Sequence, residues 1–257
     1  MEKTVLITGA TSGIGKACAE KFAASGCNLV ICGRREERLE RISQHLSSAF
    51  KIKVLTSAFD VRNRDDVFDA IEQVRKQVQR IDILINNAGL ALGRDNFADA
   101  QIDDWDTMIG TNISGLLYTT RAVLPLMEKS DHPIIINVGS IAGKEVYENG
   151  NVYCATKFAV DAISKSMRID LLKKGFKITA IHPGAVETEF SLVRFKGNRA
   201  TASSAYAGYT PLSASDVAEN IFYCATLPAH VCINELVVTC TQQANTIYFE
   251  KKPDLPQ

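Results

Sequence analysis

The sequence predicts one α/β domain whose seven-stranded, mainly parallel sheet is doubly wound, with helices on both faces. Short apolar runs rich in β-branched residues alternate along the chain with longer segments of helical periodicity, which is the pattern of βαβ units. The runs are those of parallel strands buried on both faces. The 257 residues contain no linker or repeat, and one α/β domain can hold a chain of this length. Residues 1–257 are therefore predicted to form a single domain.

The expected elements follow one another in regular order. Strands are expected at residues 4–8, 28–32, 53–58, 81–86, 134–138, 177–182 and 236–239. Helices are expected near residues 14–25, 36–48, 64–79, 103–129, 151–174 and 215–227. From about 189 to 210 the chain is polar and rich in Gly, Ala and Ser with little periodicity, which is typical of a substrate lid. Residues 251–257 are expected to form a loose C-terminal tail.

Composition and charge exclude several classes of function. Lys and Arg total 29, as do Asp and Glu, so no overall field attracts nucleic acid or an anionic membrane. The first apolar run, residues 5–7, is too short for a signal peptide, and no stretch of 18 apolar residues follows; a soluble, cytoplasmic protein is expected. The seven cysteines include no C-x-x-C pair and the four histidines have no ligand spacing, which predicts neither a disulfide framework nor a metal site.

The first expected strand leads into the sequence TGATSGIG, residues 8–15. Gly9, Gly13 and Gly15 allow a sharp turn, a close approach of the backbone to a pyrophosphate, and packing of the next helix on the strand. The N-terminus of that helix presents free N–H groups to the phosphates. The motif predicts a dinucleotide site, although its G-x-x-x-G-x-G spacing also fits a tight strand-to-helix connection. The other residues of this expected site are Thr11, Ser12 and Ile14.

Arg34 and Arg35 follow the second expected strand, where a chain that binds NAD usually has an acid for the ribose 2′-hydroxyl. Cations at a helix start oppose the helix dipole, which favours a functional reason for them. We expect Arg34, with Arg35 beside it, to bind the 2′-phosphate of NADP(H). The alternative is a pair of solvated surface arginines.

The loops after the third and fourth expected strands are also candidates for cofactor contacts. Asp60, followed by Val61, can accept a hydrogen bond from the adenine amino group, or it can act as a loop acid or helix cap. Asn87, Ala88 and Gly89 are small enough to let the chain pass close to a cofactor, although the same residues make ordinary turns.

Tyr153 and Lys157 are four residues apart in an expected helix, so both side chains lie on one helix face. A free tyrosine has a pKa of about 10, and a fixed positive charge beside it favours the phenolate. We therefore expect Lys157 to lower the pKa of Tyr153 into the range needed for proton transfer to a carbonyl oxygen. Without further context the pair also fits an exposed helix face.

With the glycine-rich turn, the Asn87-Ala88-Gly89 loop, Ser140 after the fifth strand, and the pair Tyr153 and Lys157, the chain resembles the classical short-chain dehydrogenase/reductases, which have a Rossmann-type fold. The resemblance implies a catalytic set of Asn112, Ser140, Tyr153 and Lys157. In that set the tyrosine exchanges a proton with the substrate oxygen, to which the serine donates a hydrogen bond. The lysine binds the nicotinamide ribose, and the asparagine holds a water that links the lysine to solvent. The segment expected against the nicotinamide contains Pro183, Gly184, Val186 and Thr188.

A closer likeness is to the NADP-dependent 3-hydroxy acid dehydrogenases of this family. It rests on the sequences DVRNR from Asp60, IDILINNAGLALG from Ile81, RAVLPLM from Arg121, TEFSLVRFKG from Thr188 and LPAHVCIN from Leu227. The likeness implies activity on serine, L-allo-threonine and related 3-hydroxy acids, or on malonic semialdehyde.

A small acid needs a cation for its carboxylate, and Arg194 in the expected lid is the first candidate, with Lys196 and Arg199 behind it. The alternative is a solvated basic lid. Two residues depart from the group's pattern: Asn198, where an acid is expected, and His182, where the group often has Glu.

The expected function is therefore an NADP(H)-dependent oxidoreductase that moves hydride between the nicotinamide and a small 3-hydroxy acid or its semialdehyde. One alternative is a carbonyl or 3-oxoacyl reductase with a larger, apolar substrate. Another is an inactive regulator that only binds NADP. The family resemblance also implies a homotetramer joined by the helices that carry Asn112 and Tyr153.

Overall fold

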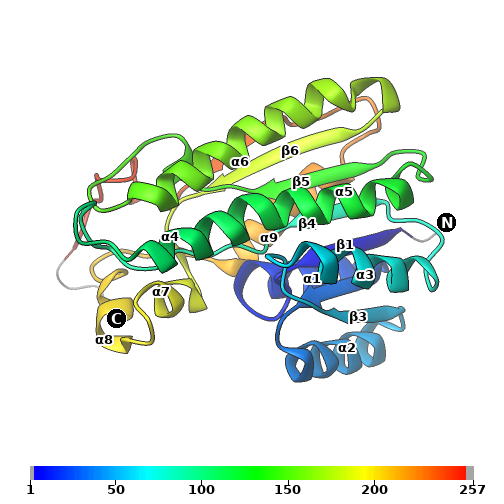
Figure 1. Ribbon diagram of the computed structural model, residues 1–257, viewed down its shortest axis with the longest axis horizontal. Helices are drawn as coiled ribbons and strands as arrows, with labels where there is room; N and C mark the ends of the chain where they lie inside the picture. The colour runs from blue at the N-terminus through cyan, green and yellow to red at the C-terminus, as the bar shows by residue number, and fades with distance from the viewer. Residues whose placement is uncertain (1–2, 253–257) are drawn as a thin grey trace.

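The computed structural model describes residues 3–252 and contains a parallel sheet of seven strands in the order β3-β2-β1-β4-β5-β6-β9. These strands are β1 (Thr4–Thr8), β2 (Asn28–Gly33), β3 (Val54–Ala58), β4 (Ile83–Asn86), β5 (Ile134–Val138), β6 (Lys177–Pro183) and β9 (Glu235–Val238). Each lies within two residues of its predicted bounds. The predicted fold, a seven-stranded parallel sheet with helices on both faces, is confirmed (Figure 1).

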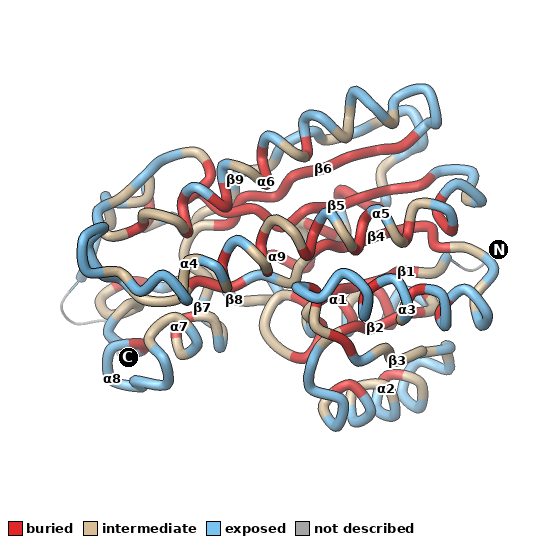
Figure 2. The backbone as a smooth tube through the Cα atoms, in the orientation of Figure 1, coloured by how far each residue is buried: buried red, intermediate tan, exposed pale blue. Residues whose placement is uncertain are grey.

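Two layers of helices cover the sheet. One layer contains α1 (Gly13–Ala24), α2 (Glu36–Phe50) and α9 (Ala214–Thr226), and the other contains α3 (Arg64–Arg75), α4 (Ile102–Ile109), α5 (Gly115–Met127) and α6 (Asn151–Asp170). The strands of the sheet centre are buried along their length, whereas the helices expose their outer faces (Figure 2). Two apolar cores therefore form, one on each face of the sheet. None of the helices among residues 3–252 is long and apolar enough to cross a membrane.

The long helix predicted over residues 103–129 is interrupted. A π-helix, η1 (Gly110–Ser114), separates α4 from α5. The helix that resumes at Gly115 packs closely on the loop after β3, because a Cβ on Gly115 would lie 2.6 Å from Val61 Cγ2. The predicted helix 151–174 likewise ends early, at Asp170, and a 3₁₀ turn, η3 (Leu172–Lys174), follows it.

The segment expected to be an irregular lid contains short elements that the sequence pattern did not reveal. Helices α7 (Glu189–Arg194) and α8 (Arg199–Ser204) lie at the carboxyl end of the sheet (Figure 1). A two-stranded sheet of β7 (Val186–Glu187) and β8 (Leu212–Ser213) flanks them. In the expected C-terminal tail, the backbone N–H of Lys252 donates to Gly208 O at 2.7 Å, while residues 253–257 lie outside the described part of the chain.

The strand order reverses direction between β1 and β4. Chain connections leave these two strands toward opposite faces, so a crevice opens beyond their carboxyl ends, which is where ligands bind in doubly wound sheets. The 3₁₀ turn η2 (Ile141–Gly143) after β5 lies at the same end. The glycine-rich turn, the Asn87 loop and Ser140 are thus brought together at this end of the sheet.

Candidate active site

A cavity of about 320 Å³ lies at this end of the sheet. The residues predicted for the cofactor site that line it are Gly9, Thr11, Ser12, Gly13, Ile14, Arg34, Arg35, Asp60, Val61, Asn87, Ala88, Gly89, Tyr153, Lys157, Pro183, Gly184, Val186 and Thr188. Gly15 is absent from the lining. A Cβ on Gly15 would lie 2.4 Å from Gly9 O, so only a residue without a side chain lets the turn close beneath the cavity.

The glycine-rich turn is held to the end of β4 by Asn87. Its Nδ2 donates to Thr8 O at 2.9 Å and to Gly9 O at 3.2 Å. Thr8 Oγ1 in turn accepts from the backbone N–H groups of Asn87 and Ala88, at 3.1 and 3.0 Å. Gly9 has φ of +66°, a conformation that glycine adopts without strain. The two loops therefore form one rigid floor for a ligand.

Arg35 is the arginine that contacts the glycine-rich turn. Its Nη2 donates to Thr11 Oγ1 at 2.7 Å and to Ser12 Oγ at 2.9 Å. Arg34 extends toward Asp60, with 3.7 Å between Nη1 and Oδ2. Both guanidinium groups border the cavity, so both are available to an anionic group.

Glu189, at the start of α7, is a residue of this site that sequence reasoning missed. Its carboxylate binds Arg35 Nη1 at 2.9 Å and Arg38 Nη1 at 2.9 Å. Side-chain hydrogen bonds from Arg35, opposed by partial burial, lower the pKa of Glu189. The lid segment and the cation pocket are thus linked, a contact across 154 residues of sequence that no local pattern could indicate.

Asp60 is held mainly by a neighbouring arginine. Its carboxylate accepts hydrogen bonds from Arg62 Nη2 at 2.7 Å and from the Arg62 backbone N–H at 3.0 Å. Although partial burial acts to raise it, these hydrogen bonds leave the pKa of Asp60 below its ordinary value. The cap of α3 is Asn63, so the reading of Asp60 as a helix cap is wrong.

Ser140 precedes η2 and its hydroxyl oxygen accepts from the Ala142 N–H at 3.1 Å. A hydroxyl that accepts in this way keeps its own proton for donation. The same hydroxyl forms a hydrogen bond with Tyr153 that acts to lower the tyrosine pKa. Ser140 and Tyr153 both line the cavity, so their oxygens face a common space.

The expectation that Lys157 lowers the pKa of Tyr153 stays a prediction, because burial dominates the pKa of both groups in this structure. Burial raises the pKa of Tyr153 above its ordinary value, and the charge that acts to lower it comes from Arg194. Lys157 is itself buried, which lowers its pKa to about 8. Its Nζ donates to Val138 O at 2.9 Å, on the side toward β5. Helical spacing fixes which face two side chains share, but not the desolvation that each one meets.

Asn112 lies in the π-helix and is buried. Its Oδ1 accepts from the Leu90 N–H at 2.9 Å, while its Nδ2 donates to Leu90 O at 2.8 Å and to Thr156 Oγ1 at 3.0 Å. It therefore holds the loop after β4 against α6, one residue from Lys157. These contacts fit a purely structural asparagine as well as a supporting role beside Lys157. Leu90 and Thr111, neighbours of these residues, line the cavity and were not predicted.

Arg194 lies over the Tyr153 ring but, unlike the cofactor-site residues, it is not among the residues that line the 320 Å³ cavity. Its guanidinium carbon is 5.6 Å from the centre of the Tyr153 ring and 5.5 Å from that of Tyr147. Nε donates to Gly93 O at 3.2 Å and Nη1 to Tyr147 Oη at 2.9 Å. Arg194 borders a second small hollow of about 10 Å³, which Tyr153 also lines. A cation thus lies next to the candidate proton donor.

The two cations expected behind Arg194 do not share this position. Lys196 is exposed, with its Nζ 2.8 Å from Asp104 Oδ2. Arg199 is exposed at the first turn of α8. Apolar side chains also pack around Tyr153. The ring centres of Tyr153 and Phe190 are 5.7 Å apart, and Met108 and Leu90 belong to the same apolar cluster as Tyr153.

One group of metal-ligand side chains lies behind the site. Asp161, His182 and Glu235 have ligand atoms within 4.8 Å of one another. Lys144 Nζ lies 2.7 Å from both carboxylates, and Lys165 Nζ lies 2.8 Å from Asp161 and 3.3 Å from Glu235. Two ammonium groups already balance the two carboxylates, so this arrangement is an ion-pair cluster.

Gln243 is a second residue missed by sequence reasoning. It is buried, and its Oε1 accepts from the Ala185 N–H at 2.8 Å, which fixes the loop that follows Pro183 and Gly184. Thr188 Oγ1 accepts from the Phe190 N–H at 3.2 Å and caps α7. Nothing in the polar C-terminal sequence marks Gln243 as a partner of this loop.

Comparison with known proteins places this site in a family. The chain is 46% identical over 245 residues to sulfoacetaldehyde reductase 2 of Chromohalobacter salexigens, covering 95% of this chain and 96% of that protein. It is 42% identical over 249 residues to the NADP-dependent 3-hydroxy acid dehydrogenase of Schizosaccharomyces pombe, covering 96% of each. The closed form of a serine dehydrogenase complexed with NADP⁺ superposes with a TM-score of 0.86 at 43% identity, over 94% of this chain and 96% of that one. Residues 3–198 match the model of the short chain dehydrogenases, and the chain therefore belongs to the short chain dehydrogenase family, as its motifs predicted.

Proposed function

We propose that this chain is an NADP-dependent oxidoreductase that moves hydride between the nicotinamide and a small hydroxy acid or the corresponding carbonyl acid. The observation that carries this function is the position of Tyr153. It lines the same cavity as Ser140 and the glycine-rich turn, and the guanidinium carbon of Arg194 is 5.6 Å from the centre of its ring. A proton donor and a hydrogen-bond donor thus share the cavity, and a cation lies next to the proton donor.

The residues of the cavity fit a phosphorylated dinucleotide. The closed glycine turn leads into the N-terminus of α1, whose first N–H groups favour a pyrophosphate. Arg35 and Arg34 provide cations for the additional 2′-phosphate of NADP, and no acid stands at these two positions to bind a ribose 2′-hydroxyl. Asn87, Ala88 and Gly89 would line its path, with Val186 and Thr188 at the nicotinamide end. When bound, NADP supplies or accepts the hydride.

Three side chains would then take part in the protonation of the substrate oxygen. Ser140 would donate its O–H proton in a hydrogen bond to the carbonyl oxygen once substrate is bound. Tyr153 is neutral at physiological pH and would pass its proton to that oxygen as negative charge develops there. Lys157 is charged below about pH 8, and its ammonium would favour the phenolate that remains. Asn112 holds the backbone beside them.

The substrate class follows from Arg194 and from the relatives. Sulfoacetaldehyde and the 3-oxo form of a 3-hydroxy acid both place an acid group that is anionic at neutral pH one carbon away from the reacting carbonyl. One arginine beside Tyr153 can bind either anion while the carbonyl faces Ser140 and Tyr153. Carboxylate and sulfonate differ in shape more than in charge, so this proposal takes both as substrates.

We further propose that residues 189–210 form the lid over the substrate. Phe190 already contacts the Tyr153 ring, and Arg194 belongs to the same helix. A cytoplasmic location agrees with the free thiols of all seven cysteines, since a reducing compartment keeps cysteines from forming disulfides. A homotetramer agrees with the apolar side chains exposed on the helices that carry Asn112 and Tyr153. These are Ile102, Ile109, Leu117, Phe158 and Ile169. Sedimentation velocity of the purified chain tests this assembly.

Initial rates with NADPH and a set of carbonyl compounds test the function. We expect turnover with malonic semialdehyde and with sulfoacetaldehyde, and a much lower kcat/KM with a bulky uncharged ketone. The reverse order would favour a carbonyl or 3-oxoacyl reductase, for which the apolar wall around Tyr153 is suited. Tight binding of NADPH with no turnover of any compound would favour an inactive binder.

A further inference from the structure

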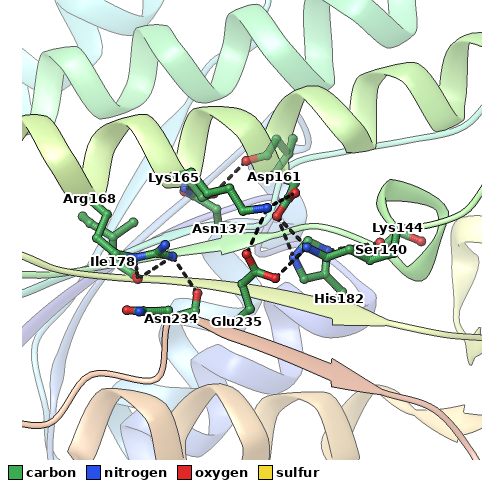
Figure 3. A network of polar contacts seen from close by, with 12 residues as sticks. Asn137, Ser140, Lys144, Asp161, Lys165, Arg168, Ile178, His182, Asn234 and Glu235 are labelled. Carbon is green, nitrogen blue, oxygen red and sulfur yellow. Dashed lines mark hydrogen bonds and ion pairs between the residues drawn. The ribbon is translucent and has the colours of Figure 1, made fainter.

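His182, the penultimate residue of β6, lies directly behind Ser140 and is fully buried. Its Nδ1 is 3.1 Å from the backbone oxygen of Ser140 (Figure 3). Gly139 makes room for this contact, because a Cβ there would lie 2.5 Å from Nδ1. Neither the family motifs nor the reaction described above uses this histidine.

The chemistry of its neighbours determines the tautomer of His182. A carbonyl oxygen only accepts, so Nδ1 must carry a proton and donate to Ser140 O. Burial first, and then the charge of Lys144, lower the pKa of His182, which favours the neutral ring. In that ring Nε2 has no proton. It has no hydrogen-bond partner among residues 3–252, and the nearest carboxylate oxygen, Asp161 Oδ1, is 3.6 Å away.

The ion-pair cluster of Lys144, Asp161, Lys165 and Glu235 lies against this histidine, with Asp161 Oδ1 3.6 Å from its Nε2 (Figure 3). Asp161 is on α6, one turn beyond Lys157, and Lys144 follows the turn that begins at Ser140. Glu235 begins β9, the strand that pairs with β6. The cluster therefore joins the loop of Ser140 to the helix of Tyr153, with His182 between them.

We propose that His182 is a positioning residue for Ser140, acting through the hydrogen bond from Nδ1–H to the Ser140 backbone oxygen. The Ser140 peptide is then held from two sides, since the Gly143 N–H also donates to this oxygen, at 2.9 Å. This fixes the direction in which the hydroxyl donates toward the substrate oxygen. The inference rests on the proposed function, in which Ser140 is a catalytic residue.

Two substitutions at position 182 separate positioning from general packing. His182→Leu removes the donor, whereas His182→Asn keeps an N–H group where Nδ1 lies. A misplaced catalytic group costs up to about a hundredfold in rate, so we expect His182→Leu to lower kcat by roughly tenfold to a hundredfold. NADPH affinity, measured by protein fluorescence, should change by less than about twofold, and His182→Asn should recover most of kcat.

Thr179→Val is the matched control. Thr179 is a buried residue of the same strand whose hydroxyl donates to a backbone carbonyl, Ile233 O, at 2.7 Å, away from Ser140. Its loss should lower the melting temperature while kcat stays within about twofold. An equal loss of kcat in Thr179→Val and His182→Leu would overturn the proposal, because it would trace both effects to stability.

A double-mutant cycle with Ser140→Ala tests the route of the effect. If His182 acts through the Ser140 hydroxyl, His182→Leu should change kcat by less than about twofold in the Ser140→Ala background. If the double variant instead loses kcat by the product of the two single losses, the inference is overturned. A low kcat in Ser140→Ala with a normal one in His182→Leu would overturn this inference alone, whereas a normal kcat in Ser140→Ala would remove the serine from the proposed function itself.

The unmodified protein gives an independent measurement. Spectra that correlate imidazole protons and nitrogens of ¹⁵N-histidine-labelled protein distinguish the two neutral tautomers, and the spectrum of His182→Asn identifies the signal of His182. We expect the Nδ1–H tautomer at neutral pH. An Nε2–H tautomer would leave nothing to donate to Ser140 O and would refute the proposal whatever the rates of the variants.

Discussion

Replacing Arg194 with methionine tests how the substrate acid is recognised. The guanidinium is fixed by Gly93 O and Tyr147 Oη, at 3.2 and 2.9 Å, and lies over the Tyr153 ring. A hydrogen bond to a charged group contributes about 1.5–3 kcal/mol, and each 1.4 kcal/mol is a factor of ten. We therefore expect kcat/KM for malonic semialdehyde to fall by about tenfold to a hundredfold. For an uncharged aldehyde of the same length it should fall by less than about threefold.

Steady-state rates of NADPH oxidation measure both values, and Arg94→Met is the matched control. Arg94 also lies over the Tyr147 ring, at 5.9 Å, but it is exposed and makes no hydrogen bond to Tyr147 within residues 3–252. Its replacement should leave both rates nearly unchanged. If Arg194→Met lowers the two rates equally, the arginine only supports Tyr147 and Tyr153, and the anion is bound by another group.

Three further predictions concern the reaction and its cofactor. Tyr153→Phe should lower kcat by orders of magnitude while NADPH affinity stays close to normal, and a substantial kcat would remove Tyr153 from its role. The ammonium of Lys157 is present below its pKa of about 8 and lost above it, so kcat for carbonyl reduction should fall as pH rises through about 8. A kcat that does not change with pH in this range contradicts the prediction. Lys157→Arg should move the fall in kcat to higher pH. Arg35→Ala should weaken NADPH binding by about tenfold or more, and Arg34→Asp should shift preference toward NADH. Titration of each variant with NADPH and NADH checks this. An unchanged ratio of the two dissociation constants would mean that other residues bind the 2′-phosphate.

The strands were predictable because each is a short apolar run that a sheet buried on both faces requires. The seven runs correspond to β1–β6 and β9, and their order brings the glycine turn, the Asn87 loop and Ser140 to one edge. Tyr153 and Lys157 were predictable as a pair because one helix carries both. Local periodicity and motif order therefore account for most of the fold and of the cavity lining.

The remaining features depend on contacts between distant segments. Asn112 in the π-helix bonds to Leu90, 22 residues away, and the pKa values of Tyr153 and Lys157 reflect burial that spacing does not encode. Glu189 was missed because its partners are Arg35 and Arg38, far away in sequence. The lid helices have only six residues each, too few for a periodic pattern to appear.

Helix α6 carries Tyr153, Lys157 and Asp161 at intervals of four residues. Inserting or deleting a single residue between them would rotate one side chain about 100° away from the others. The first two would then no longer meet the cavity together, and the last would leave the ion-pair cluster. This stretch of the chain can accept changes of composition on its outer face, but its length cannot vary.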